Sequence, residues 1–356
     1  MITKSKRDSN IELLRLLAML MVVGVHANFW TLGTPTSADI QAAPVPSFTR
    51  YLLEALTVVC VNLFVLISGY FRIRPSVRGL ANLLFLCAFY ALLPCIIHVA
   101  VTHTVSFEYL KAALLKSSDY WFIKSYLALY LLAPLLNCYL DHASRHQQFL
   151  FLVAFYVFQT YFGFLGDSTG FIAGGYSVWS FIGLYCLSAY ARAYSGWWSR
   201  CRSRVLWACY LGSSLLIALS AFGIRTLLGD RAPNLELVLY DYIFPLVVFS
   251  SLCFFLLFTR MKFQSAVINK LAASAFAVYF LHIHVQFRDY FQDCVDAIYR
   301  YTSGPVCLLY FLVLVLTVYL IGVCIDQLRI LLWRVLSVRI LPFLEKKLND
   351  RYPFKQ

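Results

Sequence analysis

Two ionisable residues, Arg15 and His26, lie inside the first long apolar segment of the chain. A helix turns through about 1100° over the eleven-residue step from one to the other, close to three full turns, and rises about 16 Å. Both side chains are therefore expected on one face of a helix. An ionisable group inside a membrane span is costly and usually faces a bundle interior or a watery path, so this face is a candidate functional site.

The two residue types suggest two chemical tasks. The guanidinium of Arg15 can bind a phosphate through its planar fork of donors. The imidazole of His26 can act as a general base on a hydroxyl, because histidine ordinarily titrates near neutrality. A donor with phosphates at one end and an acyl group on a long arm, such as acetyl-CoA, fits this separation. The structural alternative is an arginine retained on the cytoplasmic side and a histidine at a helix end.

The rest of the chain predicts a membrane protein. Of its 356 residues, 61% are hydrophobic and only 13% are charged, and the mean hydropathy is +0.72. Apolar runs near the length needed to cross a bilayer recur throughout. We expect an all-α, polytopic membrane helix bundle of about ten transmembrane helices, at 11–30, 52–70, 79–101, 122–140, 148–164, 173–191, 205–224, 239–258, 268–286 and 305–325.

Basic residues predict the orientation of this bundle, because short loops rich in Lys and Arg stay in the cytoplasm. Most of the 30 Lys and Arg residues fall on one side if both termini are cytoplasmic. The net charge of +13 then reflects topology and gives little support for nucleic-acid binding. No stretch outside the spans can bury its own core. Residues 1–356 are therefore expected to form one domain, with 326–356 as a cytoplasmic, basic, amphipathic tail on the membrane lipids.

Polar residues of the second expected span add further candidates. Glu54 and Asn62 are eight residues apart and predict a polar wall near the outer mouth. Glu54 is a candidate to orient His26, as a carboxylate does for a catalytic imidazole. Ser68 either borders the same site or, with Gly69, allows close helix packing, since small residues are favoured there in membranes.

Later segments offer two more candidates for a substrate site. His282 and His284 are two residues apart, so at most one is expected to face the cavity. Trp121 belongs either to an interfacial aromatic belt or to a sugar-binding wall. The eleven cysteines lie mostly inside expected spans and show no zinc-site spacing, so we expect packing residues and no metal.

Four segments stand in one order over nearly the whole chain. They are the first helix, with Arg15, ten intervening residues and His26; VNLFVLISGYF at 61–71; DYWFIKSYLALYLLAPLLN at 119–137; and VYFLHIHV at 278–285. In this order they resemble the signatures of the acyltransferase family 3 membrane proteins.

The resemblance implies transfer of an acyl group, usually acetyl, from cytoplasmic acyl-CoA to a sugar hydroxyl of a cell-surface or lipid-linked glycan. His26 would be the catalytic base, and Arg15 the motif arginine that matters for the acyl donor. Arg72, Arg74 and Arg78 correspond to a basic inner loop near the coenzyme. Some members have two arginines separated by two residues in this loop. In this chain one residue separates Arg72 from Arg74, and three residues separate Arg74 from Arg78.

Several consequences of the resemblance stay open. Acetyl-CoA would be a donor substrate, with no permanently bound cofactor, and the location would be a bacterial inner membrane. His26 would either deprotonate the sugar hydroxyl or carry the acyl group itself. The alternative function is a transporter or flippase for a small solute or a lipid-linked sugar. Transporters also use charged residues inside the membrane. They usually show inverted repeats and pairs of broken helices, which this sequence does not indicate.

Overall fold

The computed structural model describes residues 8–351 apart from 106, 109–110, 112–119, 168, 197, 232–233 and 285–286. These described residues form helices and no strand, as expected for an all-α protein. Their α-helices are α1 (Ser9–Val25), α2 (Ser37–Ala42), α3 (Pro44–Thr57), α4 (Cys60–Phe71), α5 (Val77–Thr102), α7 (Trp121–His142), α8 (Arg145–Leu165), α9 (Val178–Ala193), α10 (Ser203–Leu228), α11 (Pro245–Thr259), α12 (Ala266–Ala272), α13 (Ala275–Ile283), α14 (Arg288–Tyr301) and α15 (Gly304–Arg351). A π-helix, η1 (His26–Trp30), follows α1, and a 3-10 helix, η6 (Leu235–Tyr240), lies before α11.

Eight helical segments of the described chain are long and apolar enough to cross a membrane. They are Ser9–Trp30, Pro44–Phe71, Val77–Thr102, Trp121–His142, Ser203–Leu228, Leu235–Thr259, Ala266–Ile283 and Gly304–Val338. Each overlaps an expected span, but the second begins at Pro44 instead of 52, and the last continues to Val338, into the segment expected to be the tail. The other two expected spans, 148–164 and 173–191, fall on α8 and α9. α9 has only 16 residues, or about 24 Å, which is short of the about 30 Å of a hydrocarbon core. The count of ten stays a prediction.

Four of the spans are not continuous α-helices. The first changes from α1 to the π-helix η1 at His26, the second is interrupted at Val58–Val59 between α3 and α4, and the seventh is interrupted at Ala273–Ser274 between α12 and α13. The sixth changes from the 3-10 helix η6 to α11 across residues 241–244. π-Helical turns inside α-helices often mark functional sites. These interruptions therefore direct attention to the region around His26.

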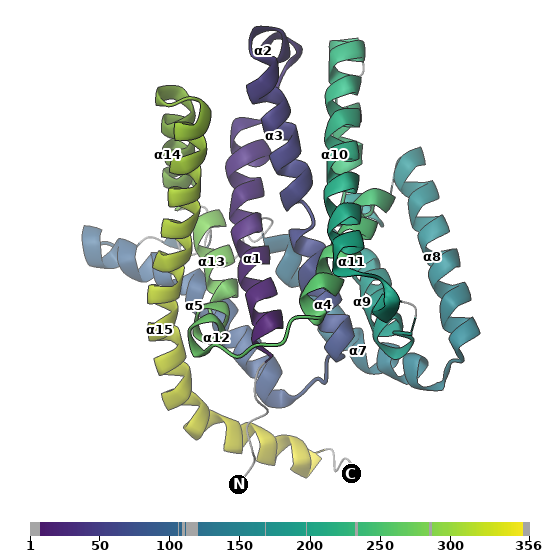
Figure 1. Cartoon of the computed structure of the whole chain (residues 1–356). Coiled ribbons are helices and arrows are strands. Elements are labelled where there is room, and N and C mark those ends of the chain that lie inside the picture. The colour runs from purple at the N-terminus through teal and green to yellow at the C-terminus, as the bar shows by residue number, and fades with distance from the viewer. Residues whose placement is uncertain are drawn as a thin grey trace.

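α4 forms the centre of the bundle. It packs against α1, α9 and α11 (Figure 1), and every residue from Cys60 to Ile67 is buried. α4 approaches α9 closely at Gly69, where an added Cβ would lie 2.2 Å from the backbone oxygen of Tyr185. Gly69 is thus required for this contact, which supports the packing interpretation of the Ser68–Gly69 pair.

The long helix α15 combines the last expected span with the expected tail. Its 48 residues run without interruption from Gly304 to Arg351. Within the tail, Asp326 and Arg329 are buried and form an ion pair, with Arg329 Nη2 3.1 Å from Asp326 Oδ2, and the Tyr90 hydroxyl of α5 donates to Asp326 at 2.9 Å. The first turn of the tail therefore packs against the bundle.

Both ends of the described chain lie at one end of the bundle (Figure 1). This is the arrangement that an even number of spans produces. The cytoplasmic assignment of that end stays a prediction from the basic residues. Residues 112–119, between the expected spans 79–101 and 122–140, and residues 352–356 of the tail lie outside the described residues.

Candidate active site

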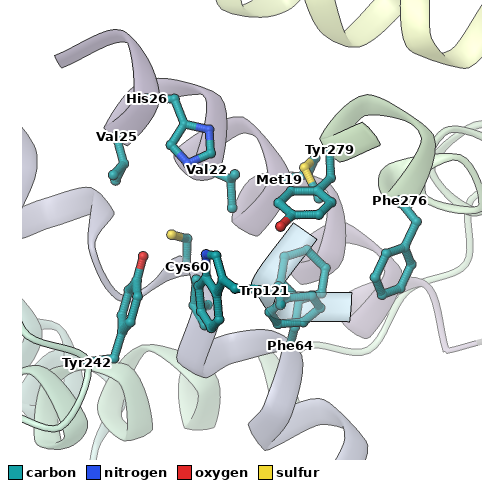
Figure 2. A pocket seen from close by; sticks show the side chains of 12 residues that line it. Met19, Val22, Val25, His26, Cys60, Phe64, Trp121, Tyr242, Phe276 and Tyr279 are labelled. Atoms are coloured by element: carbon teal, nitrogen blue, oxygen red, sulfur yellow. The ribbon is translucent and has the colours of Figure 1, made fainter. Parts of the chain in front are cut away.

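A pocket lies in the middle of the bundle, with about 430 Å³ of empty space including its open mouth. It is lined from five helical elements and from the residues before α11 (Figure 2): Met19, Val22, Val25, His26, Cys60, Val61, Phe64, Trp121, Phe122, Tyr242, Phe276 and Tyr279. His26, Cys60 and Phe276 each lie within a few residues of one of the helix interruptions. The breaks thus occur where the pocket is built.

One face of the first helix forms a wall of this pocket. Met19, Val22 and His26 line it together, and Arg15 stands four residues before Met19 on the same helical stripe. The predicted common face of Arg15 and His26 is consistent with this arrangement. Arg15 lies nearer the start of α1, where Nη1 donates to Oε1 of Glu12 at 2.6 Å, and its side chain stays 37% exposed. The guanidinium can therefore still reach a ligand.

The π-helix that carries His26 is pinned to α3 by hydrogen bonds. Asn28 Nδ2 donates at 2.9 Å both to the carbonyl of Arg50 and to Oε2 of Glu54, and Arg50 Nε donates back to Asn28 Oδ1 at 3.0 Å. Thr31 Oγ1 donates to the carbonyl of His26 at 2.6 Å. Sequence reasoning missed Asn28, because nothing local distinguishes it from a polar residue at a helix end.

The ring of His26 contacts another histidine. Its Nδ1 lies 2.7 Å from Nε2 of His282 on α13, and Nδ1 of His282 lies 2.6 Å from the carbonyl oxygen of Val278. The ring nitrogen of His26 therefore has His282 as its partner, where the sequence suggested Glu54. His282 is 3% exposed and lies behind His26, outside the pocket lining that the structure describes. His284, also 3% exposed, lies with its ring centroid 6.4 Å from that of Tyr120.

An aromatic wall faces the first helix across the pocket. Trp121 and Tyr242 both line the pocket and are stacked, with ring centroids 5.8 Å apart and an interplanar angle of 26°. Tyr176 packs against both, at 4.4 Å from Trp121 and 5.0 Å from Tyr242. Trp121 thus lines the pocket, and its role in a sugar-binding wall stays a prediction. The two tyrosines come from distant segments, so no local pattern could have identified them.

Asn62 and Ser68 are not among the residues that line the pocket, and their side chains make structural hydrogen bonds. Asn62 is fully buried, and its Nδ2 donates to the carbonyl of Tyr242 at 3.0 Å and to Ser251 Oγ at 3.3 Å. Ser68 Oγ donates to the carbonyl of Phe64 at 2.8 Å and lies 3.2 Å from the Tyr126 hydroxyl. Asn62 therefore supports the backbone behind the aromatic wall, and Ser68 closes its own helix turn.

The three arginines after α4 lie at the end of the bundle where α1 begins, because α4 runs antiparallel to α1 (Figure 1). Arg72 forms an ion pair with Asp141, while Arg74 and Arg78 are exposed. The site therefore has two parts. Arg15 and this basic loop occupy one end of the bundle, and His26 occupies the pocket farther along α1.

Comparison with known proteins adds one match. A family model described as an acyltransferase domain matches residues 8–326. No curated protein and no solved structure matches the chain. The matched region begins one residue before α1 and includes every residue that lines the pocket, together with all four candidate arginines.

Proposed function

The chain belongs to acyltransferase family 3, whose model covers nearly all of it. On this premise we propose that it transfers an acyl group, in the first instance acetyl, from cytoplasmic acyl-CoA to a sugar hydroxyl of a cell-surface or lipid-linked glycan. The observation that carries the proposal is the position of His26. A histidine that lines a pocket inside an apolar bundle, with one ring nitrogen held by a second histidine, is suited to general-base catalysis on a hydroxyl.

The donor would bind at the basic end of the bundle. Arg15, with Arg72, Arg74 and Arg78, provides guanidinium groups that suit phosphates. The stripe from Arg15 through Met19 and Val22 to His26 then offers an apolar path for the acyl arm, about 16 Å long at the rise of an α-helix. A coenzyme held at one end could thus present its thioester at the other.

The acceptor would bind against the aromatic wall. Trp121 and Tyr242 present stacked ring faces in the pocket that contains His26. Aromatic rings combine a large apolar face with polar tips, here the indole N–H and the phenol hydroxyl. This combination suits a sugar, whose C–H faces can lie on the rings while its hydroxyls point toward His26.

The transfer itself needs one proton carrier. Nε2 of His26 takes the proton of the sugar hydroxyl, the hydroxyl oxygen bonds to the thioester carbon, and the C–S bond breaks. The imidazolium of His26 then donates this proton to the departing thiolate, so His26 ends neutral. The other route, in which His26 carries the acyl group before the sugar receives it, uses the same nitrogen as nucleophile.

The proposed location is a bacterial inner membrane with both termini in the cytoplasm. The basic loop after α4 and the start of α1 would then face the cytoplasmic pool of acyl-CoA, in agreement with the positive-inside rule. His26 would lie toward the outer side. This arrangement would allow an external glycan to be modified without export of the coenzyme.

The test is transfer of radiolabelled acetyl from acetyl-CoA to endogenous glycan in membranes that contain the wild type or His26→Gln at equal protein levels. We expect label with the wild type and near-background label with His26→Gln. His103→Asn is the matched control, because His103 is exposed after α5 in a left-handed conformation that asparagine tolerates. Equal labelling by His26→Gln would remove His26 from the chemistry.

One observation favours transport as the second candidate. The spans interrupted at Val58–Val59 and at Ala273–Ser274 resemble the broken helices that transporters use around a central site. A transporter would accumulate solute in sealed vesicles without acyl-CoA. An acyltransferase would consume acetyl-CoA in detergent, where no gradient exists. Solute accumulation together with absent acyl transfer would favour the transporter.

A further inference from the structure

Two histidines that are far apart in the sequence share one hydrogen bond in this site. His26 belongs to η1 and His282 to α13, 256 residues later, yet Nδ1 of His26 lies 2.7 Å from Nε2 of His282. Two N–H groups cannot approach so closely, and two lone pairs would repel. One of the two nitrogens must therefore donate and the other accept.

The carbonyl group of Val278 decides which nitrogen donates. Nδ1 of His282 lies 2.6 Å from this oxygen, and a carbonyl oxygen can only accept, so Nδ1 of His282 carries a proton. A neutral imidazole has one proton, which leaves a lone pair on Nε2 of His282. His26 then donates from Nδ1, and its own Nε2 carries the lone pair. His26 lines the pocket (Figure 2), so this free nitrogen is the one available to a bound hydroxyl.

We infer that His282 is a positioning residue: its Nε2 accepts the Nδ1–H of His26 and so fixes the tautomer in which Nε2 of His26 is the base. The inference rests on the proposed acyl transfer. In Ser-His-Asp triads a carboxylate holds the same N–H of the catalytic histidine. Here a neutral imidazole does so, on a helix whose neighbouring residues are apolar.

The surroundings of His282 explain why an imidazole suits this position. Its ring packs against Phe291 at 5.7 Å and Tyr279 at 6.4 Å, and the flanking Ile283 is buried. A charged carboxylate among such side chains would carry a large desolvation cost. The neutral ring avoids this cost and still provides an acceptor. When Nε2 of His26 takes the hydroxyl proton, the resulting imidazolium keeps its hydrogen bond to Nε2 of His282.

The first test measures the tautomer directly and needs no acyl transfer. In detergent-solubilised protein with ¹⁵N-labelled histidine, we expect the signals of His26, identified by their loss in His26→Gln, to show a protonated Nδ1 and an unprotonated Nε2. His142 provides a reference in the same sample, since its Nδ1 lies 2.8 Å from the carbonyl of Cys138. A wild-type His26 protonated at Nε2 and not at Nδ1 would overturn the inference.

The second test uses two substitutions that differ in what they offer to His26. Gln at position 282 can present an amide oxygen where Nε2 now accepts, whereas Phe fills the space with no acceptor. We expect His282→Phe to lower kcat by about 10²- to 10⁴-fold, the range for a general base lost or held in the wrong tautomer, and His282→Gln to recover most of that loss. The KM for acetyl-CoA should stay unchanged in both, because His282 lies outside the pocket lining.

His103→Asn is the control here too, because His103 is an exposed histidine after α5 and does not line the pocket. It should transfer acetyl at the wild-type rate. Full activity of His282→Phe, or equal loss in His282→Gln and His282→Phe with unchanged elution in gel filtration, would overturn the positioning role. Absence of acetyl transfer by the wild type would contradict the proposed function alone, since the tautomer measurement does not depend on it.

Discussion

The side-chain amide of Asn28 joins η1 to Glu54, donating from Nδ2 to Oε2 at 2.9 Å. Glu54 lies on α3 and is 4% exposed. The same amide group also donates to the carbonyl of Arg50 and accepts from its guanidinium. The connection from Glu54 to His26 therefore runs through Asn28 and the turn of η1. Glu54 holds the segment that carries the histidine, while His282 holds the ring itself.

This relationship predicts different outcomes for two substitutions of Glu54. Glu54→Gln keeps an oxygen that accepts from Asn28, so transfer of acetyl should stay within a few-fold of wild type. Glu54→Ala removes the acceptor and leaves a buried gap, which should cost about 1–3 kcal/mol of unfolding free energy and lower kcat. Thermal unfolding in detergent and the acetyl-transfer assay measure both effects. Loss in Glu54→Gln as deep as in His26→Gln would show that the carboxylate charge itself takes part in the chemistry.

The first helix shows how much of this site the sequence could predict. Arg15 and His26 were expected on one face because helical geometry alone relates residues eleven apart. Met19 and Val22, which fall on the same stripe, line the pocket with His26. Local periodicity was sufficient here, since no other part of the chain was needed to define the face.

The remaining features depend on contacts between distant segments. The pairing of His26 with His282 joins residues 256 positions apart, and no periodicity relates them. The interruption at Val58–Val59 has no Gly or Pro to signal it, and β-branched residues are tolerated in apolar helices. The predicted roles of Glu54 and Asn62 in one polar wall assumed a continuous helix. Because α3 and α4 are separate helices, the two side chains have different partners.

Gly69 offers a prediction about the packing of the bundle. An added Cβ would lie 2.2 Å from the oxygen and 2.6 Å from the Cα of Tyr185, which are backbone atoms that cannot rotate away. Gly69→Ala should therefore lower the free energy of unfolding by about 1–3 kcal/mol or more. Gly212→Ala is the control, since nothing lies within 4 Å of its added Cβ in α10. Equal thermal midpoints for the two variants, measured by gel filtration after heating, would contradict the close approach of α4 to α9.

Trp121 allows the aromatic wall to be tested. Trp121→Ala should raise the KM for the acceptor, because the ring stacks on Tyr242 and faces the pocket, whereas Trp121→Phe should retain part of the contact. An aromatic pair contributes about 0.5–1.5 kcal/mol beyond its buried area, so a change of a few-fold to about tenfold is expected for the lost ring. The KM for acetyl-CoA should not change. Trp207→Phe, at an exposed position on α10, is the control. A rise in the KM for acetyl-CoA instead would place the donor against this wall.

Arg15 tests whether the donor is held through its phosphates. A hydrogen bond to a charged group contributes about 1.5–3 kcal/mol, so Arg15→Gln should raise the KM for acetyl-CoA by about tenfold or more. kcat should change little, since His26 lies about 16 Å farther along the helix. S-acetyl-pantetheine, which has the same reactive arm without phosphates, should react equally with the wild type and the variant. Arg204→Gln, an exposed arginine in the first turns of α10, is the charge-matched control. An equal effect of Arg15→Gln on both donors would mean that Arg15 supports the fold through Glu12 and makes no contact with the phosphates.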